Sequence, residues 1–298
     1  MTRSTRTFAG LTLAFAAACA GESKTSDTTR AAAHDSGTTA AAPKSNCPGD
    51  NGGLTLATGF CATVFADTVG PARHIVVSSN GDVYATMQTQ TWATGAAAKA
   101  YPAVVAMRDT NHDGVADVIE KFGEAGGTGI AIYNGYLYVD QQTKLERYRM
   151  TAGQLSPSKT AEVVLDGLPI DGDHKARNFV IGDDGALYVN LGSFSNSCQQ
   201  KDRTPESPGK DPCVELETRA GIWKYDAKKL GQHFSKSARF ATGIRNAVGL
   251  TMDGKGRVWT TQHGRDQVDM FASHFTHEQN AELPAEELMQ VNKGDDFG

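Results

Sequence analysis

The stretch FVIGDDGALYVN, residues 179–190, contains the unit that decides the fold. An apolar run, Phe179–Ile181, leads into the turn sequence Asp183-Asp184-Gly185, and Ala186–Val189 follows as a second apolar run. Two β-branched or aromatic runs joined by acidic residues and glycine are typical of a β-hairpin. The stretch therefore predicts two antiparallel strands joined by a tight turn.

The same hairpin recurs along the chain, with a turn glycine and a following aromatic residue at constant spacing. These pairs are Gly81 and Tyr84, Gly135 and Tyr138, Gly185 and Tyr188, and Gly256 and Trp259. The aromatic residues are 54, 50 and 71 positions apart (138 − 84, 188 − 138, 259 − 188). Strand pairs that recur at about 40 to 50 residues are typical of propeller blades, whereas a β-sandwich would not repeat these positions. The repeat predicts four blades.

The composition agrees with an all-β fold in one or two domains. The chain has 298 residues, 39% of them hydrophobic, with 32 glycines and no long stretch of helical periodicity. The net charge of −5 and the absence of a Lys/Arg-rich run argue against a nucleic-acid partner.

The N-terminal residues predict export. Arg3 and Arg6 precede an apolar stretch, Phe8–Ala18, that is too short to span a bilayer, and Cys19 follows. This pattern resembles a bacterial lipoprotein signal, in which Cys19 is acylated, although ordinary secretory cleavage nearby stays open. We expect residues 1–19 to be the signal, residues 20–45 a flexible Ala/Thr/Ser-rich tether and residues 46–298 the propeller, on a periplasmic protein whose membrane contact is the lipid at Cys19.

Four further cysteines fall into two close pairs, Cys47 with Cys61 and Cys198 with Cys213. Four cysteines allow three pairings, but local pairing matches the two compact loops that contain them. Free buried thiols are the alternative, which an oxidising compartment disfavours. We therefore expect two local disulfides.

Polar residues flank the predicted hairpins at the ends away from their turns. Because the two strands of a hairpin run in opposite directions, its entrance and its exit emerge on one face of the propeller, around the mouth of the central channel. The segments concerned are Arg73-His74, Gln88, Gln141-Gln142, His174–Arg177, Ser193–Asn196, Arg245-Asn246 and Gln262–Asp266. We expect them to form a polar, largely cationic ring, with His174 where a ligand would lie.

Five stretches carry a family resemblance: GFCATVFAD, GDHKARNFVIGDDGALYV, SPGKDPCVELETRAGIWKYDA, ATGIRNAVGL and TTQHGRD. In order and spacing they resemble the sorbosone dehydrogenase branch of the soluble sugar dehydrogenases that depend on pyrroloquinoline quinone (PQQ). The resemblance spans residues 47–298. It implies a six-bladed β-propeller with PQQ in the mouth and Ca²⁺ beside it, which oxidises a sugar or sugar-derived alcohol or aldehyde by hydride transfer to the quinone and passes the electrons to an unknown acceptor.

The resemblance also implies residue roles. His174 would remove the hydroxyl proton, and Arg245 would stabilise charge on the quinone oxygen. The cofactor contacts would be Arg245, Asn246, His263, Gly264 and Arg265, and the carbonyls of Gly264 and Arg265 would bind calcium. Gln88 and Asp266, which belong to the polar ring at the hairpin ends, are expected to contact the cofactor as well. Two features depart from the family: HKARNF is unlike the segment common after this histidine, and Arg265 stands where many relatives have proline.

A second calcium signal is independent of the resemblance. The segment DTNHDGVADVIE matches the EF-hand loop pattern through Asp109, Asn111, Asp113, Asp117 and Glu120. The preceding PAVVAM reads as a strand, so we expect a calcium loop within a blade. The alternative is an acidic hairpin turn without an ion.

Four blades do not close a six-bladed ring. From the resemblance we expect the propeller to be truncated after about four blades, with the flanks of its first and fourth blades exposed and with weak PQQ binding by this chain alone. Two other functions stay open: a calcium-dependent, lactonase-like hydrolase, which would need a ring of carboxylates, and a non-catalytic carbohydrate-binding propeller, which would need no base at His174.

Overall fold

The computed structural model describes residues 47, 49–88, 101–283 and 286–298. Contacts along the chain define one compact unit over residues 46–298. The predicted signal with Cys19 and the predicted tether lie outside the described residues. Among the described helices, none has both the length and the apolar character needed to cross a membrane.

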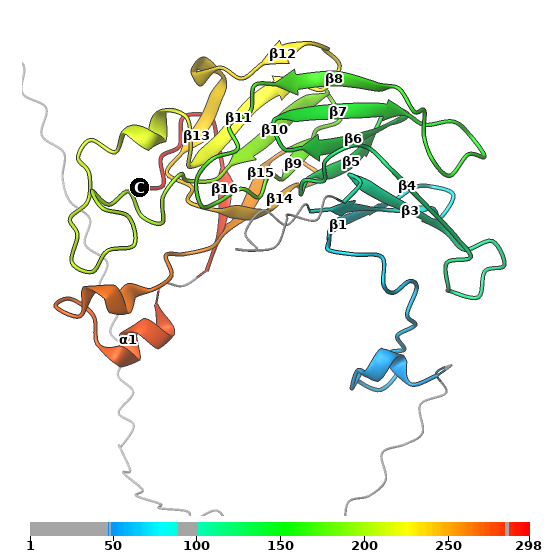
Figure 1. Ribbon diagram of the computed structural model, residues 1–298, viewed down its shortest axis with the longest axis horizontal. Helices are drawn as coiled ribbons and strands as arrows, with labels where there is room; N and C mark the ends of the chain where they lie inside the picture. Colours follow the sequence, from blue (N-terminus) through cyan, green and yellow to red (C-terminus); the bar gives the residue numbers. More distant parts are fainter. Residues whose placement is uncertain (1–46, 48, 89–100, 284–285) are drawn as a thin grey trace, which may run out of the picture. The chain divides into compact units, whose positions relative to one another are not determined.

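Four antiparallel sheets follow one another along this unit (Figure 1). The first contains β1 (Ala72–Val77), β2 (Val83–Met87), β3 (Val104–Arg108) and β4 (Val118–Phe122). The second contains β5 (Ile130–Tyr133), β6 (Tyr136–Gln141), β7 (Lys144–Arg149) and β8 (Ala161–Asp166). The third contains β9 (Phe179–Ile181), β10 (Ala186–Leu191), β11 (Gly221–Asp226) and β13 (Arg239–Thr242), and the fourth β14 (Ala247–Met252), β15 (Val258–Gln262) and β16 (Glu287–Val291).

Each sheet is a meander, and the first strands of the four sheets, β1, β5, β9 and β14, contact one another in succession. One short strand departs from this pattern: β12 (Gln232–His233), from the third repeat, pairs in parallel with β8 of the second sheet. The described α-helix is α1 (His277–Glu282), with short 3-10 turns elsewhere. This is the arrangement of propeller blades around a channel, and it confirms the all-β, four-blade prediction.

The turn glycines explain why the hairpin repeats. Gly81, Gly135, Gly185 and Gly256 adopt φ values of +90°, +76°, +89° and +75°. This left-handed region is strained for residues that carry a Cβ, so each tight turn requires glycine. The predicted hairpins are confirmed, since each turn joins the first and second strands of its sheet.

Three of the four repeated aromatic residues, Tyr84, Tyr138 and Tyr188, lie in hydrophobic clusters between neighbouring blades, whereas Trp259 is partly buried. Tyr84 and Tyr138 are almost fully buried, and Tyr188 packs edge-on against Phe240 with ring centroids 4.9 Å apart. The Tyr84 hydroxyl donates to the Leu155 carbonyl at 2.9 Å, which satisfies the polar end of a buried ring. The repeat therefore specifies the turn of each blade and, in the first three blades, the packing against the next one.

The sequence predicted that the flank of the first sheet would be exposed, but most of this flank is covered. Met87 and Val105 are buried at 1% and 0% exposure, because the segment around Phe65 packs over them. Ile75 and Val77, at the inner edge of the same face, stay 63% and 60% exposed. The residues before β1 thus cover most of an apolar face that the hairpin pattern alone leaves open.

Both predicted disulfides are confirmed. Cys47 bonds to Cys61 with their Cα atoms 5.4 Å apart, and Cys198 bonds to Cys213 with a Cα separation of 6.1 Å. The second bridge closes a long loop between β10 and β11 that reaches the candidate site.

Candidate active site

The entrance and exit of each hairpin meet, as the strand directions predict. In the third blade the His174 amide donates to the Ser193 carbonyl at 3.4 Å. In the fourth, the His263 amide donates to the Asn246 carbonyl at 3.0 Å. The Ser193 amide also donates to the Arg245 carbonyl at 2.7 Å, which joins the two blades at this end. These loops define the mouth in the described residues.

His174 is half-buried at the mouth. Its Nδ1 lies 2.7 Å from the Ser193 hydroxyl and 3.2 Å from the Ser193 carbonyl oxygen, while Nε2 has no hydrogen-bond partner among the described residues. A Cβ at Gly192 would lie 2.6 Å from the His174 Cβ, so this approach requires glycine. Burial first, and then the positive charge of Arg245, lower the pKa of His174 below its ordinary value. The imidazole is therefore neutral near pH 7, with one ring nitrogen free.

Arg245 ties the third blade to the fourth with all five of its N–H groups. Nε donates to the Asn196 carbonyl at 2.7 Å, and Nη1 donates to the carbonyls of Gly264 at 2.7 Å and His263 at 3.1 Å. Nη2 donates to the Asn196 side chain and, at 3.1 Å, to Asp266. A guanidinium has five donors, so none is left over for a ligand in this arrangement.

Arg203 is a site residue that the sequence analysis missed. It lies within the loop closed by the second disulfide, and its Nε donates to Asp173 Oδ2 at 2.9 Å. Its Nη1 donates to Gln267 at 2.9 Å and to Asp266 at 3.4 Å. Asp173, Arg203, Asp266 and Arg245 thus form a chain of alternating charges. Only the long insertion in the third repeat could have pointed to this residue.

Arg177 was expected in the cationic ring, but it is a buried structural residue. Its side chain is 4% exposed and donates to Asp140 at 3.3 Å and to the carbonyls of Gln142 and Pro169. The Asp140 carboxylate is 2% exposed and also accepts from the amides of Thr128 and Gln142. With Arg177, Arg203 and Arg245 all paired to carboxylates, the mouth carries much less free positive charge than the sequence predicted.

Gln88 lies apart from the Arg245 network. It lines a cavity of about 100 Å³ between the first three blades, together with Gln142, Lys175 and Arg177. Lys175 is exposed, so its ammonium is the accessible cation of this cavity.

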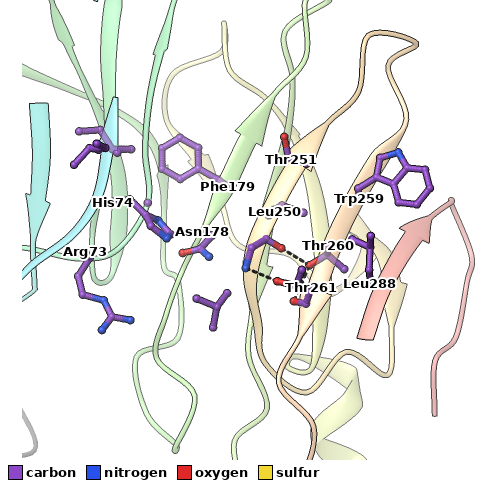
Figure 2. A pocket seen from close by; sticks show the side chains of 15 residues that line it. Arg73, His74, Asn178, Phe179, Leu250, Thr251, Trp259, Thr260, Thr261 and Leu288 are labelled. Carbon is purple, nitrogen blue, oxygen red and sulfur yellow. Dashed lines mark hydrogen bonds between the residues drawn. The ribbon is translucent and has the colours of Figure 1, made fainter. Parts of the chain in front are cut away.

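The inner strands of the four sheets line a larger cavity of about 660 Å³ (Figure 2). His74, on β1, and Asn178, just before β9, lie near one another on one side of the cavity with Arg73, while Trp259 and Leu288 lie on the fourth sheet (Figure 2). The wall of this cavity is mixed, with aliphatic, aromatic and hydroxyl side chains beside Arg73, His74 and Asn178.

The loop of the EF-hand pattern is compact but does not gather all its predicted ligands. The carboxylates and the amide oxygen of Asp109, Asn111 and Asp113 accept hydrogen bonds from backbone amides of the loop, and Asp117 accepts from Thr110. Glu120 lies in β4 and bonds to the Ser156 hydroxyl instead. Four of the five predicted ligands therefore lie in one turn, and Glu120 is separate.

The donors at the mouth fit an anionic quinone cofactor such as PQQ. Two nitrogens of Arg265, Nε and Nη2, are buried without a hydrogen-bond partner among the described residues, and the guanidinium lies 4.0 Å from the centroid of the Phe271 ring. The side-chain oxygen of Asn246 is likewise buried and unpaired in the described part of the chain. The free donors of Arg265 suit a carboxylate, because buried donors without partners are costly. The exposed ammonium of Lys175 is a further cation, in the separate cavity at Gln88.

The same residues, as arranged, do not fit calcium at Gly264. The Gly264 carbonyl already accepts from Arg245, whose positive charge occupies the place of a cation. Within the described residues, a cluster of His, Cys, Asp or Glu side chains close enough to bind one metal ion occurs only at Cys198, Cys213 and Glu215. The two cysteines of this cluster form a disulfide with each other. The loop at Gly264, as arranged, therefore offers no calcium site.

Four meandering sheets around a channel, with a half-buried neutral histidine among polar loops at one end, define a β-propeller with a candidate active site at its mouth. The chain belongs to the TrAA12-like family, whose family model matches residues 54–297. The sorbosone dehydrogenase branch stays a prediction from the sequence.

Solved structures agree with this fold. A Trichoderma reesei structure of Carbohydrate-Active Enzymes Family AA12 aligns with a TM-score of 0.60 at 17% identity, over 78% of this chain and 56% of that one. The holo PQQ domain of Coprinopsis cinerea pyranose dehydrogenase aligns with a TM-score of 0.53 at 16% identity, over 68% and 46%. A putative oxidoreductase (glucose dehydrogenase) from Thermus thermophilus aligns with a TM-score of 0.50 at 15% identity, over 78% and 65%. No curated protein matches the chain.

Proposed function

We propose that this chain forms the catalytic mouth of a PQQ-dependent oxidoreductase that oxidises a sugar, or a sugar-derived alcohol or aldehyde, with His174 as general base. One observation carries the proposal. His174 is neutral and half-buried, its Nδ1 is satisfied by Ser193, and its Nε2 has no partner among the described residues. A general base requires a free lone pair on a fixed side chain at the mouth of a site.

PQQ, when bound, supplies an ortho-quinone that accepts hydride, and its carboxylates require donors from the protein. Arg265, whose Nε and Nη2 have no partner among the described residues, and the exposed Lys175 have donors to offer. His174 Nε2 takes the proton of the substrate hydroxyl as the C–H hydrogen leaves with its electron pair. Arg245 contributes a fixed positive charge near His174 while its N–H groups hold Asn196 and the loop at Gly264.

Two structural neighbours are named as sugar oxidoreductases, which favours this class over the alternatives. They are a pyranose dehydrogenase and a glucose dehydrogenase, and at 16% and 15% identity their likeness to this chain shows the fold. A lactonase-like hydrolase would need a ring of free carboxylates, whereas Asp140, Asp173 and Asp266 are each paired with an arginine. We further propose that the substrate is of the sorbosone type, that the loop at Asp109 binds calcium, and that the protein is periplasmic and anchored by a lipid at Cys19.

The test reconstitutes the protein with PQQ and measures sugar-dependent dye reduction. His174→Ala should lower turnover by about two to four orders of magnitude while the absorbance of bound PQQ is retained. His233→Ala, an exposed histidine on β12, is the matched control and should turn over normally. Normal turnover by His174→Ala would end the assignment. Lactone hydrolysis without PQQ, or sugar binding without any turnover, would instead support one of the two alternatives.

A further inference from the structure

A chain of hydrogen bonds reaches His174 from the loop closed by the second disulfide. The Ser193 hydroxyl lies 2.7 Å from His174 Nδ1 and donates its hydrogen to the Ser195 carbonyl, also at 2.7 Å. A hydroxyl has one hydrogen, so towards His174 this oxygen acts as the acceptor. The Ser193 carbonyl oxygen, 3.2 Å from the same Nδ1, has no hydrogen and can act only as an acceptor.

Both contacts therefore require the proton of the neutral imidazole to be on Nδ1. The tautomer of a histidine is set by the hydrogen bonds that its ring nitrogens make. With Nδ1 protonated, Nε2 carries the free lone pair. The opposite tautomer would place the Nδ1 lone pair against the Ser193 carbonyl oxygen, and it would draw the Ser193 hydroxyl hydrogen away from the Ser195 carbonyl.

Ser193 is itself held in place by Ser195, which in turn is held by Glu215. Ser193 and Ser195 are 4% and 2% exposed. The Ser195 amide and hydroxyl both donate to the Glu215 carboxylate, at 3.1 and 2.9 Å. The Cys198 amide donates to the Ser195 hydroxyl at 2.8 Å, and Glu215 follows Cys213 in the 3-10 turn Val214–Glu217. The Cys198–Cys213 bridge therefore fixes both ends of the Ser195–Glu215 contact.

We infer that Ser193 is a positioning residue that fixes His174 in the Nδ1–H tautomer, and that Ser195 and Glu215 hold Ser193 for this role. Ser193 does not touch the substrate; it acts through His174 by leaving the Nε2 lone pair available. The inference about the tautomer stands on the contacts alone, and its consequence for turnover rests on the proposed function.

The tautomer can be read without cofactor or substrate. Protein labelled with ¹⁵N-histidine and observed by long-range ¹H–¹⁵N correlation near pH 7.5 distinguishes a protonated from an unprotonated ring nitrogen, with His174→Ala providing the assignment. We expect His174 to have a protonated Nδ1 and an unprotonated Nε2. A wild-type spectrum with the proton on Nε2 would overturn the inference, whatever the variants do.

Three variants test the source of the preference. Ser193→Ala removes the hydroxyl acceptor, so the Nε2–H form should become detectable, and kcat should fall on the order of tenfold to hundredfold with KM little changed. Ser193→Thr keeps the hydroxyl and should retain the wild-type tautomer. Glu215→Gln should give a smaller shift in the same direction. Ser237→Ala, in an exposed turn, is the control for a serine unconnected to His174.

The outcomes separate the inference from the proposed function. If the wild-type tautomer is Nδ1–H and His174→Ala turns over normally, the proposed base is wrong and the tautomer assignment stands. If His174→Ala is inactive but Ser193→Ala keeps both the tautomer and kcat, His174 remains the base and Ser193 has no positioning role.

Discussion

Replacing Arg177 with methionine tests whether this residue is structural or belongs to a cationic ligand ring. The substitution keeps most of the length of the side chain and removes its charge and donors. Asp140 would then be a carboxylate at 2% exposure with only the amides of Thr128 and Gln142 as partners. Breaking a buried ion pair by removing one partner costs about 3 to 5 kcal/mol. For a domain of this size that corresponds to a fall in Tm of roughly 6 to 20 °C.

The pH dependence provides a second check on Arg177→Met. Burial raises the pKa of Asp140, and Arg177 opposes this effect, so without Arg177 the pKa of the folded state lies further above that of the unfolded chain. A raised folded-state pKa makes protonation favour folding, so the loss of stability should be smaller at pH 5 than at pH 8. Urea unfolding of the cofactor-free protein at both pH values measures it.

Two variants complete the experiment. Arg177→Met with Asp140→Asn removes both charges and should be less destabilised than Arg177→Met alone. Arg149→Met, an exposed arginine at the end of β7, should change stability by less than about 0.5 kcal/mol. A change below about 1 kcal/mol for Arg177→Met, without pH dependence, would refute the buried pair and return Arg177 to the ligand ring.

Three further predictions follow from the site and its loops. Because the pKa of His174 in the free protein is lowered from 6.5, the acidic limb of kcat/KM should lie below pH 6.5, and a limb above 6.5 would contradict the burial of the imidazole. The same shift means that the stability contributed by this residue is present above pH 6.5 and is lost as the pH falls through its folded-state pKa. Replacing Cys198 and Cys213 by serine should cost roughly 3 kcal/mol in urea unfolding, from a bridge of sequence separation 15, and an unchanged midpoint would argue against it. If the loop at Asp109 binds calcium, Asp109→Asn should weaken sensitised terbium luminescence about tenfold relative to Asp67→Asn, and equal luminescence would remove the proposed site.

The sequence predicted the architecture because the rules that produce it are local. A tight turn with positive φ needs glycine at Gly185 and its equivalents, whatever surrounds it. Antiparallel strands bring the two ends of a hairpin together, so His174 was predicted to lie near Ser193 from chain direction alone. Cysteines separated by a short loop were expected to pair locally, and they do. Each inference needed only residues close in sequence.

The sequence did not predict which partner each charged side chain would find. In the sequence, three arginines look equivalent as cations near the mouth. In the structure, Arg177 is buried in an ion pair with Asp140, and Arg203 links Asp173 to Asp266. Arg245 donates all its N–H groups to neighbouring loops. These partners come from different blades or from the insertion loop, so they become neighbours only when the blades pack.

The repeat, the turns, the disulfides and the meeting of hairpin ends were thus determined by the sequence alone, through backbone rules that act over a few residues. The tertiary structure alone decided the cover over the first blade, the neutralisation of the mouth and the support of His174 by Ser193, Ser195 and Glu215. The physical reason is that burial and charge pairing depend on which surfaces face one another, and contacts between blades are set by packing over long sequence distances.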